Sequence, residues 1–150
     1  MGFITEFIAR FINAIVNVHP IHSVAVHFPI ALTGAALLFL VLALWRRSEL
    51  LERAAFYNIT LSVIGTIVAG LTGYRDSVVR LGGVAPLVNV KIFLAVTLLV
   101  LTAAISISRW RNPEVVWKPS TMVVYLSAFA GSFALAVALG FLGGVILYGF

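Results

Sequence analysis

Four long apolar runs constrain the fold more than any other feature of the sequence. They cover about residues 24–45, 55–74, 88–108 and 122–148. Each run has about 20 residues or more, and a helix that rises ~1.5 Å per residue needs about that length to cross a hydrocarbon core of ~30 Å. The sequence therefore predicts an all-α integral membrane protein whose four transmembrane helices form a bundle.

Composition indicates a single membrane domain over residues 1–150, with the lipid bilayer as its surroundings. Hydrophobic residues make up 62% of the chain and charged residues 10%, whereas soluble domains have about a half and about a quarter. The chain has no cysteine, which excludes disulfides, iron–sulfur ligation and covalent c-type haem attachment. The net charge of +5 fits loops that face anionic lipid, and no basic run with interleaved aromatics indicates nucleic-acid binding.

A shorter amphipathic stretch, residues 3–17, precedes the first run. Apolar residues recur in it at helical spacing, and Glu6 and Arg10 fall on the opposite side. Because the stretch is too short and too polar to span a bilayer, we expect a helix that lies in the membrane interface.

Four spans place both termini on one side of the membrane, and the basic residues predict which side. The first and third loops carry six Lys or Arg residues, and the opposite side carries four. Since basic residues favour cytoplasmic loops, both termini are expected outside. The six are Arg46, Arg47, Arg53, Arg109, Arg111 and Lys118, and the four are Arg10, Arg75, Arg80 and Lys91.

All the histidines lie within residues 19–30, where the first span begins. A proline is tolerated in the first turn of a helix but kinks a helix interior. Pro29 therefore predicts either a helix that starts near Phe28 or one that starts near Ser23 and kinks. Both alternatives place His27 at or just below one membrane surface. The three histidines are His19, His22 and His27.

The topology gathers polar residues at the outer side, where spans one and three start and spans two and four end. Ionisable groups near a membrane are candidates for function. The alternative without a functional site is that Arg75 pairs with Asp76 at the surface and that Lys91 only extends to the interface. The gathered residues are His19, His22, His27, Tyr74, Arg75, Asp76, Asn89, Lys91 and Tyr148.

Three kinds of chemistry are open to these histidines. Their spacing, and Pro20 between the first two, disfavour a metal-ion site, which needs three or four close ligands. No Ser–His–acid set or paired carboxylates are visible, so no independent catalytic activity is expected. A tetrapyrrole is the third option, with His27 as axial ligand and Arg75 or Lys91 at the propionates. Because all the histidines share one segment, the metal would be five-coordinate, take a ligand from a partner, or be magnesium.

The segment HPIHSVAVHFPIAL, residues 19–32, resembles the N-terminal signature of a bacterial four-helix membrane family catalogued as domain of unknown function 2231, whose pattern is close to HPxHPxxVHFPI. Residues 71–76, Asn89 and the GFLGG segment at 140–144 resemble its later motifs. The resemblance implies the bacterial inner membrane, a redox context and b-type haem. His19, His22 and His27 carry over to this chain.

The chain departs from the family pattern in ways that bear on haem. Many relatives have a histidine where this sequence has Ala85, and another just after the final tyrosine, where Gly149 and Phe150 follow here. Ser23 stands where a proline is usual. If the missing histidines are ligands in relatives, this protein has kept the scaffold and lost or simplified the site.

Three functions are consistent with these features. The first is a small subunit of a respiratory or photosynthetic electron-transfer complex that binds haem b or a chlorophyll-type pigment. The second is a structural or assembly subunit without a cofactor. The third, a stand-alone metal-handling or transport protein, is disfavoured because no broken helix pair is evident. Small residues four apart in span four are expected to contact other membrane subunits: Ala128, Ser132, Ala136, Gly140 and Gly144.

Overall fold

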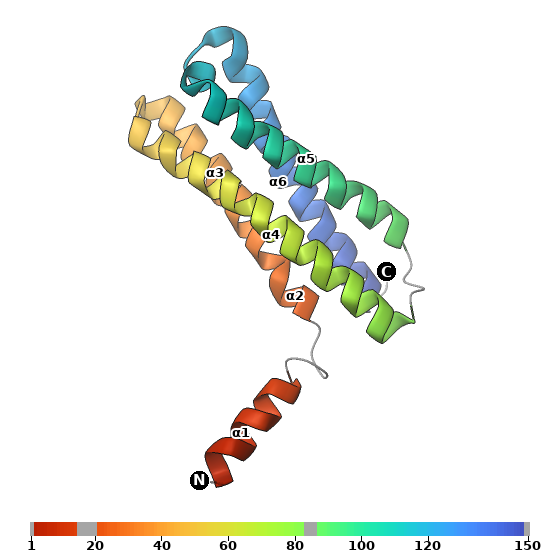
Figure 1. Ribbon diagram of the computed structural model, residues 1–150. Helices are drawn as coiled ribbons and strands as arrows, with labels where there is room; N and C mark the ends of the chain where they lie inside the picture. The colour runs from red at the N-terminus through yellow and green to blue at the C-terminus, as the bar shows by residue number, and fades with distance from the viewer. Residues whose placement is uncertain (1, 15–20, 83–86, 149–150) are drawn as a thin grey trace.

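The computed structural model describes residues 2–14, 21–82 and 87–148, and the described chain is built from helices (Figure 1). Four stretches are long and apolar enough to cross a membrane, which confirms the predicted all-α architecture with four spans. The helices are α1 Gly2–Asn13, α2 Ile21–Ala25, α3 His27–Arg46, α4 Glu49–Leu81, α5 Val88–Arg111, the 3-10 helix η2 Pro113–Val116, and α6 Pro119–Tyr148. The candidate spans are Ile21–Arg46, Glu49–Val79, Val88–Arg111 and Pro119–Ile146.

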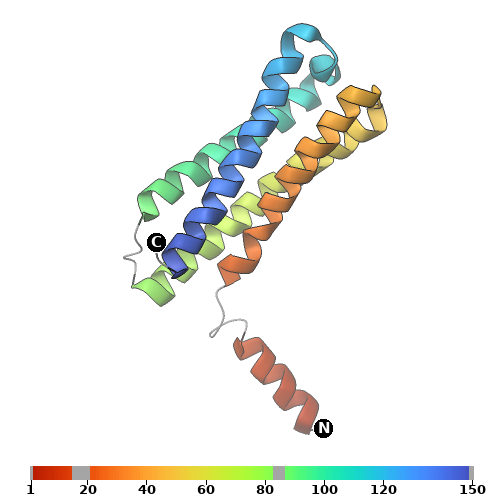
Figure 2. The same cartoon turned by 180° about the vertical axis from the view of Figure 1, so that it is seen from behind.

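The long helices form an up-and-down bundle with two distinct ends (Figures 1 and 2). Helix α3 packs mainly against α4 and also against α6, and α5 packs against α4 and α6. The start of α2, the end of α4, the start of α5 and the end of α6 meet at one end, here called the His22 end. The other end, where α3 turns into α4 and η2 joins α5 to α6, is called the Glu52 end.

Helix α4 is longer at both ends than the predicted span 55–74. The expected charged loop after the first span shrinks to Arg47 and Ser48, because the Ser48 side chain caps the helix by accepting a hydrogen bond from the Leu51 N–H at 3.4 Å. Glu49 and Glu52 follow in the first turn, where negative charge favours a helix start. These residues therefore extend the helix instead of forming a loop.

The first span begins before Pro29 with the short helix α2, and the long helix α3 starts at His27, so Pro29 lies in the first turn of α3. The short helix α2 and helix α3 are separated by a turn at Val26, whose N–H donates to the His22 carbonyl at 3.0 Å. Pro29 lacks an N–H and is buried against α4. A Cβ added to Gly65 would lie 3.3 Å from the Pro29 Cδ, so Gly65 lets the two helices approach closely.

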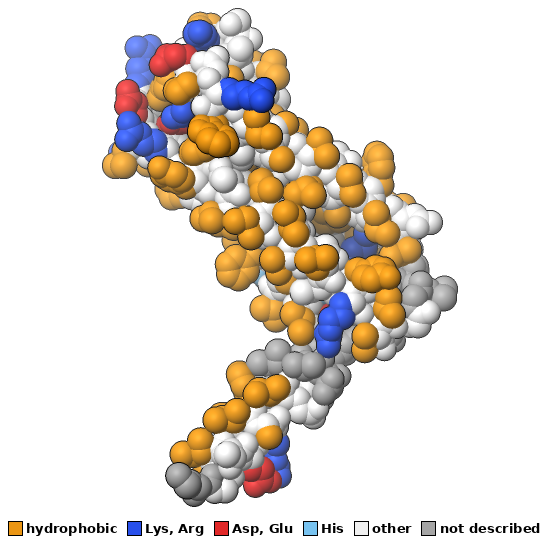
Figure 3. Space-filling view, viewed as in Figure 1, with side chains coloured by type: hydrophobic (Ala, Val, Ile, Leu, Met, Phe, Trp, Pro, Cys, Tyr) orange, Lys and Arg blue, Asp and Glu red, His pale blue; other side chains and the backbone are white. Residues whose placement is uncertain are grey.

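The buried apolar cluster lies in the half of the bundle nearer the Glu52 end. Phe129 at its centre has no exposed surface, and residues from α3, α4, α5, η2 and α6 pack around it. On the face seen in Figure 3, apolar side chains cover the middle of the bundle, while most charged side chains lie toward its ends. An apolar exterior is what a lipid-facing surface requires. The cluster comprises Ala36, Leu40, Ala55, Ile59, Ile105, Val116, Tyr125 and Phe129.

The small-residue ladder of α6 faces into the bundle for much of its length. Ser132 and Ala136 are buried, and a Cβ added to Gly140 would lie 2.8 Å from the Cδ1 of Ile30 on α3. These three residues pack within their own chain, and contact of the ladder with another subunit stays a prediction. Ala128 is half-buried, and Gly144 has no neighbour within 4 Å of an added Cβ.

Candidate functional site

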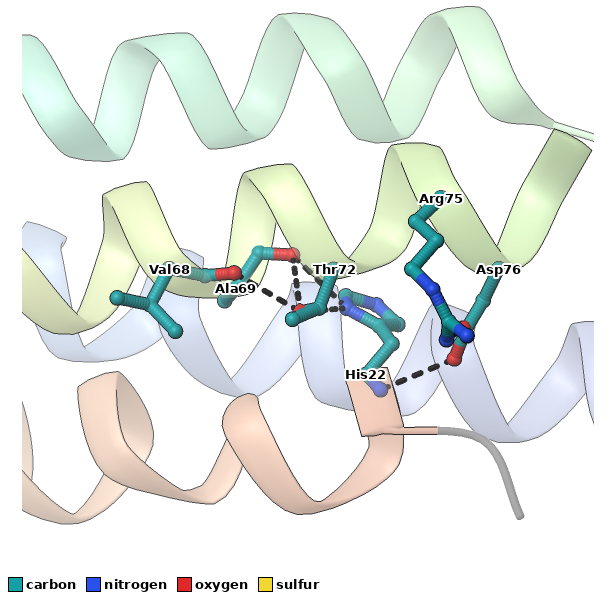
Figure 4. Close-up of polar contacts among 6 residues, drawn as sticks. All are labelled: His22, Val68, Ala69, Thr72, Arg75 and Asp76. Atoms are coloured by element: carbon teal, nitrogen blue, oxygen red, sulfur yellow. Dashed lines mark hydrogen bonds and ion pairs between the residues drawn. The ribbon is translucent and has the colours of Figure 1, made fainter. Parts of the chain in front are cut away.

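His22 ties the short helix α2 to helix α4. Its Nδ1 lies 2.9 Å from the carbonyl oxygen of Ala69, and since a carbonyl only accepts, Nδ1 carries the proton (Figure 4). The Thr72 hydroxyl lies 3.5 Å from the same nitrogen and itself donates to the Val68 carbonyl at 2.8 Å. The half-buried imidazole is thus fixed in both tautomer and orientation.

Asp76 adds a second link between the same two helices. Its Oδ2 accepts a hydrogen bond from the backbone N–H of His22 at 3.0 Å, and its Oδ1 lies 3.1 Å from the Arg75 Nη1 (Figure 4). The first N–H groups of a helix have no partner within the helix, so a carboxylate from α4 supplies what α2 lacks. Asp76 is buried, and it lies in α4 beyond the predicted end of the span at Tyr74.

Glycine at position 73 makes room for the His22 ring. A Cβ added to Gly73 would lie 2.9 Å from the Cε1 of His22, closer than real Cβ contacts come, and 3.0 Å from its Nδ1, which is also tight. Gly65, Ala69 and Gly73, spaced four residues apart on α4, form a close-packing surface. It accommodates Pro29 at one level and His22 at another.

Lys91 lies in the first turn of α5, next to α6, at the His22 end of the bundle. Its side chain is half-buried, and its Nζ would lie 3.8 Å from a Cβ added to Gly143 of α6. Lys91 therefore lies at the same end of the bundle as His22, Arg75 and Asp76.

His27 is separated from this cluster. Its side chain is exposed, and its Nδ1 lies 2.6 Å from the Ser23 carbonyl oxygen one turn earlier, so this nitrogen again carries the proton. Five helical residues rotate a side chain by about 140° around the axis. His22 faces α4 while His27 faces outward, and no hydrogen-bond partner for the His27 Nε2 lies among the described residues.

The other predicted site residues contribute less. Tyr74 and Asn89 have exposed side chains, His19 lies outside the described residues, and so does the side chain of Tyr148. Within the described ranges, no three His, Cys, Asp or Glu side chains lie close enough to hold a metal ion.

A second polar cluster, at the Glu52 end, was missed by the sequence analysis. Glu52 is only 2% exposed, and Arg109 of α5 binds it through two nitrogens, Nε to Oε1 and Nη2 to Oε2, the latter at 2.7 Å. The Arg109 Cζ lies 5.6 Å from the Phe56 ring centroid. The hydroxyl of Tyr125 is buried nearby and has no hydrogen-bond partner among the described residues. The sequence did contain a signal for the burial of Glu52. Ala55 and Ile59, three and seven residues later, are core residues and lie on the same face of the helix as Glu52.

A family model described as "Predicted membrane protein (DUF2231)" matches residues 18–150. The chain belongs to this family. The match covers the four spans and both polar clusters, while α1 lies outside it, so the DUF2231 bundle is the part that relatives share. The predicted resemblance is thereby confirmed. No curated protein and no solved structure matches the chain.

Proposed function

We propose that this DUF2231 protein is a small integral membrane subunit of an electron-transfer complex, in which His27 is an axial ligand of haem b or a chlorophyll-type pigment. The observation that carries the proposal is the state of the His27 imidazole. Its Nδ1 is held by the Ser23 carbonyl at 2.6 Å, while the ring itself is exposed. Metal-binding histidines usually donate their other N–H to a carbonyl or carboxylate in this way, which leaves a lone pair on the second nitrogen.

The surroundings of His27 suit a flat apolar ring. Its neighbours Val24 and Phe28 are 70% and 64% exposed and lie in a candidate membrane span. His27 is six residues from the start of that span, or ~9 Å along a helix. This depth places it close to one surface of the bilayer and not at its centre. A bound tetrapyrrole would supply the redox or pigment chemistry, and His27 would hold one face of it.

His22 is not available as a second ligand to the same metal. Its ring is bound to Ala69 and packed on Gly73, on a different side of the first span. The proposal therefore requires a magnesium pigment with one axial ligand, a five-coordinate iron, or a ligand from another subunit. Arg75 is paired with Asp76, so binding a propionate would require Arg75 to exchange or share this partner.

The structural alternative, a subunit without a cofactor, also has an observation in its favour. The His22 imidazole and the α6 ladder are both used for packing within the chain. This accounts for one histidine without any ligand, but it leaves the exposed His27 unexplained. We therefore place the cofactor proposal first.

A binding titration of the purified full chain tests the proposal. Haem b and zinc protoporphyrin, the latter standing in for a magnesium pigment, are added in mild detergent, and the Soret band is followed. We expect a shifted, saturable band for the native chain and for His19→Ala, and its loss in His27→Ala. Since His27 is exposed, its removal should leave the helical circular dichroism unchanged. Equal binding by His27→Ala would show that the assignment is wrong.

A further inference from the structure

Helix α1 has a complete apolar face that no other part of the described chain covers. None of its residues is buried, and its six large apolar side chains are between 48% and 83% exposed. They form one side of the helix, with charged side chains on the other, and α1 stands apart from the bundle (Figures 1 and 3). The six are Phe3, Ile4, Phe7, Ile8, Phe11 and Ile12.

The length of the chain keeps α1 near one membrane surface. Residues 14–20 separate it from α2, where the first span begins, and seven residues at ~3.5 Å each reach no further than ~25 Å. With 12 residues, α1 is ~18 Å long and cannot cross a hydrocarbon core of ~30 Å. The bilayer is within reach of α1, but the helix is too short to span it. Both facts favour a helix that lies flat in the membrane interface.

The polar face of α1 is electrically neutral. Its charged residues are Glu6 and Arg10, one turn apart, and they pair with each other at 2.6 Å between Oε1 and Nη2. A helix that binds through anionic lipid carries several unpaired Lys or Arg residues on this face, which α1 does not. Attraction to the membrane must therefore come from the apolar face.

We infer that α1 is a charge-neutral anchor whose apolar face inserts into the phospholipid interface at the His22 end, independently of anionic lipid and of salt. It lies outside the DUF2231 match, so it adds a membrane-surface contact to the shared bundle. The inference does not rest on His27 or on any cofactor.

The absence of native cysteine makes a direct test possible. A nitroxide spin label is attached to Ile4→Cys on the apolar face or to Ala9→Cys on the polar face, in the full chain in lipid nanodiscs. Collision rates with oxygen and with a water-soluble nickel chelate are then measured. We expect the label at position 4 to favour oxygen and the label at position 9 to favour nickel. The pattern should be the same in pure phosphatidylcholine, with added phosphatidylglycerol, and in high salt.

A second variant keeps the inference falsifiable. Adding Phe7→Glu and Phe11→Glu should release α1 and make the label at position 4 accessible to nickel. Three results would overturn the inference: both labels accessible to nickel in the unaltered helix, both labels shielded from both reagents, as in a protein groove, or a pattern that needs anionic lipid and low salt.

Discussion

Arg109 binds the buried carboxylate of Glu52 through two nitrogens at the Glu52 end of the bundle. The two residues are 57 positions apart and join α4 to α5. Removing one partner of a buried pair leaves an uncompensated charge, which costs about 3–5 kcal/mol. Glu52→Ala and Arg109→Ala should each lower the free energy of unfolding by that order, measured by denaturant titration in mixed micelles.

The chain contains a matched control for this ion pair. Glu49 and Arg53 form an exposed pair on the same helix, with a distance of 3.6 Å, and exposed pairs contribute little. Glu49→Ala should leave stability nearly unchanged. A double replacement of Glu52 and Arg109 by leucine should cost less than either single change, because no charge is left buried. If Glu49→Ala were as harmful as Glu52→Ala, burial would not explain the effect.

Tyr125 provides a prediction of the opposite sign. Its hydroxyl is buried and has no hydrogen-bond partner in the described part of the chain, which costs about 1–3 kcal/mol relative to a satisfied or absent group. Tyr125→Phe removes the hydroxyl and keeps the ring, which lies 5.0 Å from the Phe129 ring between centroids. Its free energy of unfolding should therefore be equal to or higher than that of the native chain. A clear decrease would mean that the hydroxyl has a partner.

Gly73 should be intolerant of even one added methyl group. In Gly73→Ala the new Cβ would meet the His22 ring at 2.9 Å and displace it from the Ala69 carbonyl. The control is Gly70→Ala on the same helix, where nothing lies within 4 Å and alanine is favoured by about 1 kcal/mol in a helix interior. Thermal unfolding should rank Gly70→Ala at or above the native chain and Gly73→Ala below it.

A rescue experiment separates this clash from other effects. Combining Gly73→Ala with His22→Ala removes the ring that the methyl group meets, so the second change should cost less in the Gly73→Ala background than alone. Additive losses would show that the His22 ring is not what makes glycine necessary at position 73.

The lengths of the apolar runs predict most of the fold, because a bilayer imposes one length and one secondary structure on each span. The bounds of α4 could not be predicted from hydropathy. Glu52 and Asp76 look like loop residues, and only tertiary partners, Arg109 for the one and the His22 N–H for the other, make their burial possible.

The His22 end was predicted as a cluster from topology alone, since spans that run antiparallel must bring alternate ends together. The separation of His22 from His27 is a consequence of helical rotation across the turn at Val26. The sequence left it open whether that turn existed, because Pro29 is compatible with either helix start. The inward direction of the α6 ladder was likewise not predictable, since small residues suit contacts within a chain and between chains equally.

The central claim, that His27 presents a free nitrogen to a tetrapyrrole, is tested most directly by the absorption spectrum of the protein purified from its native membrane in mild detergent. Spectra are recorded with and without dithionite, and pigment extraction and mass spectrometry of co-purifying subunits follow. The account predicts either a Soret band that shifts on reduction, which indicates haem, or far-red bands that do not, which indicate a chlorophyll-type pigment. A colourless preparation that retains its partner subunits would contradict it.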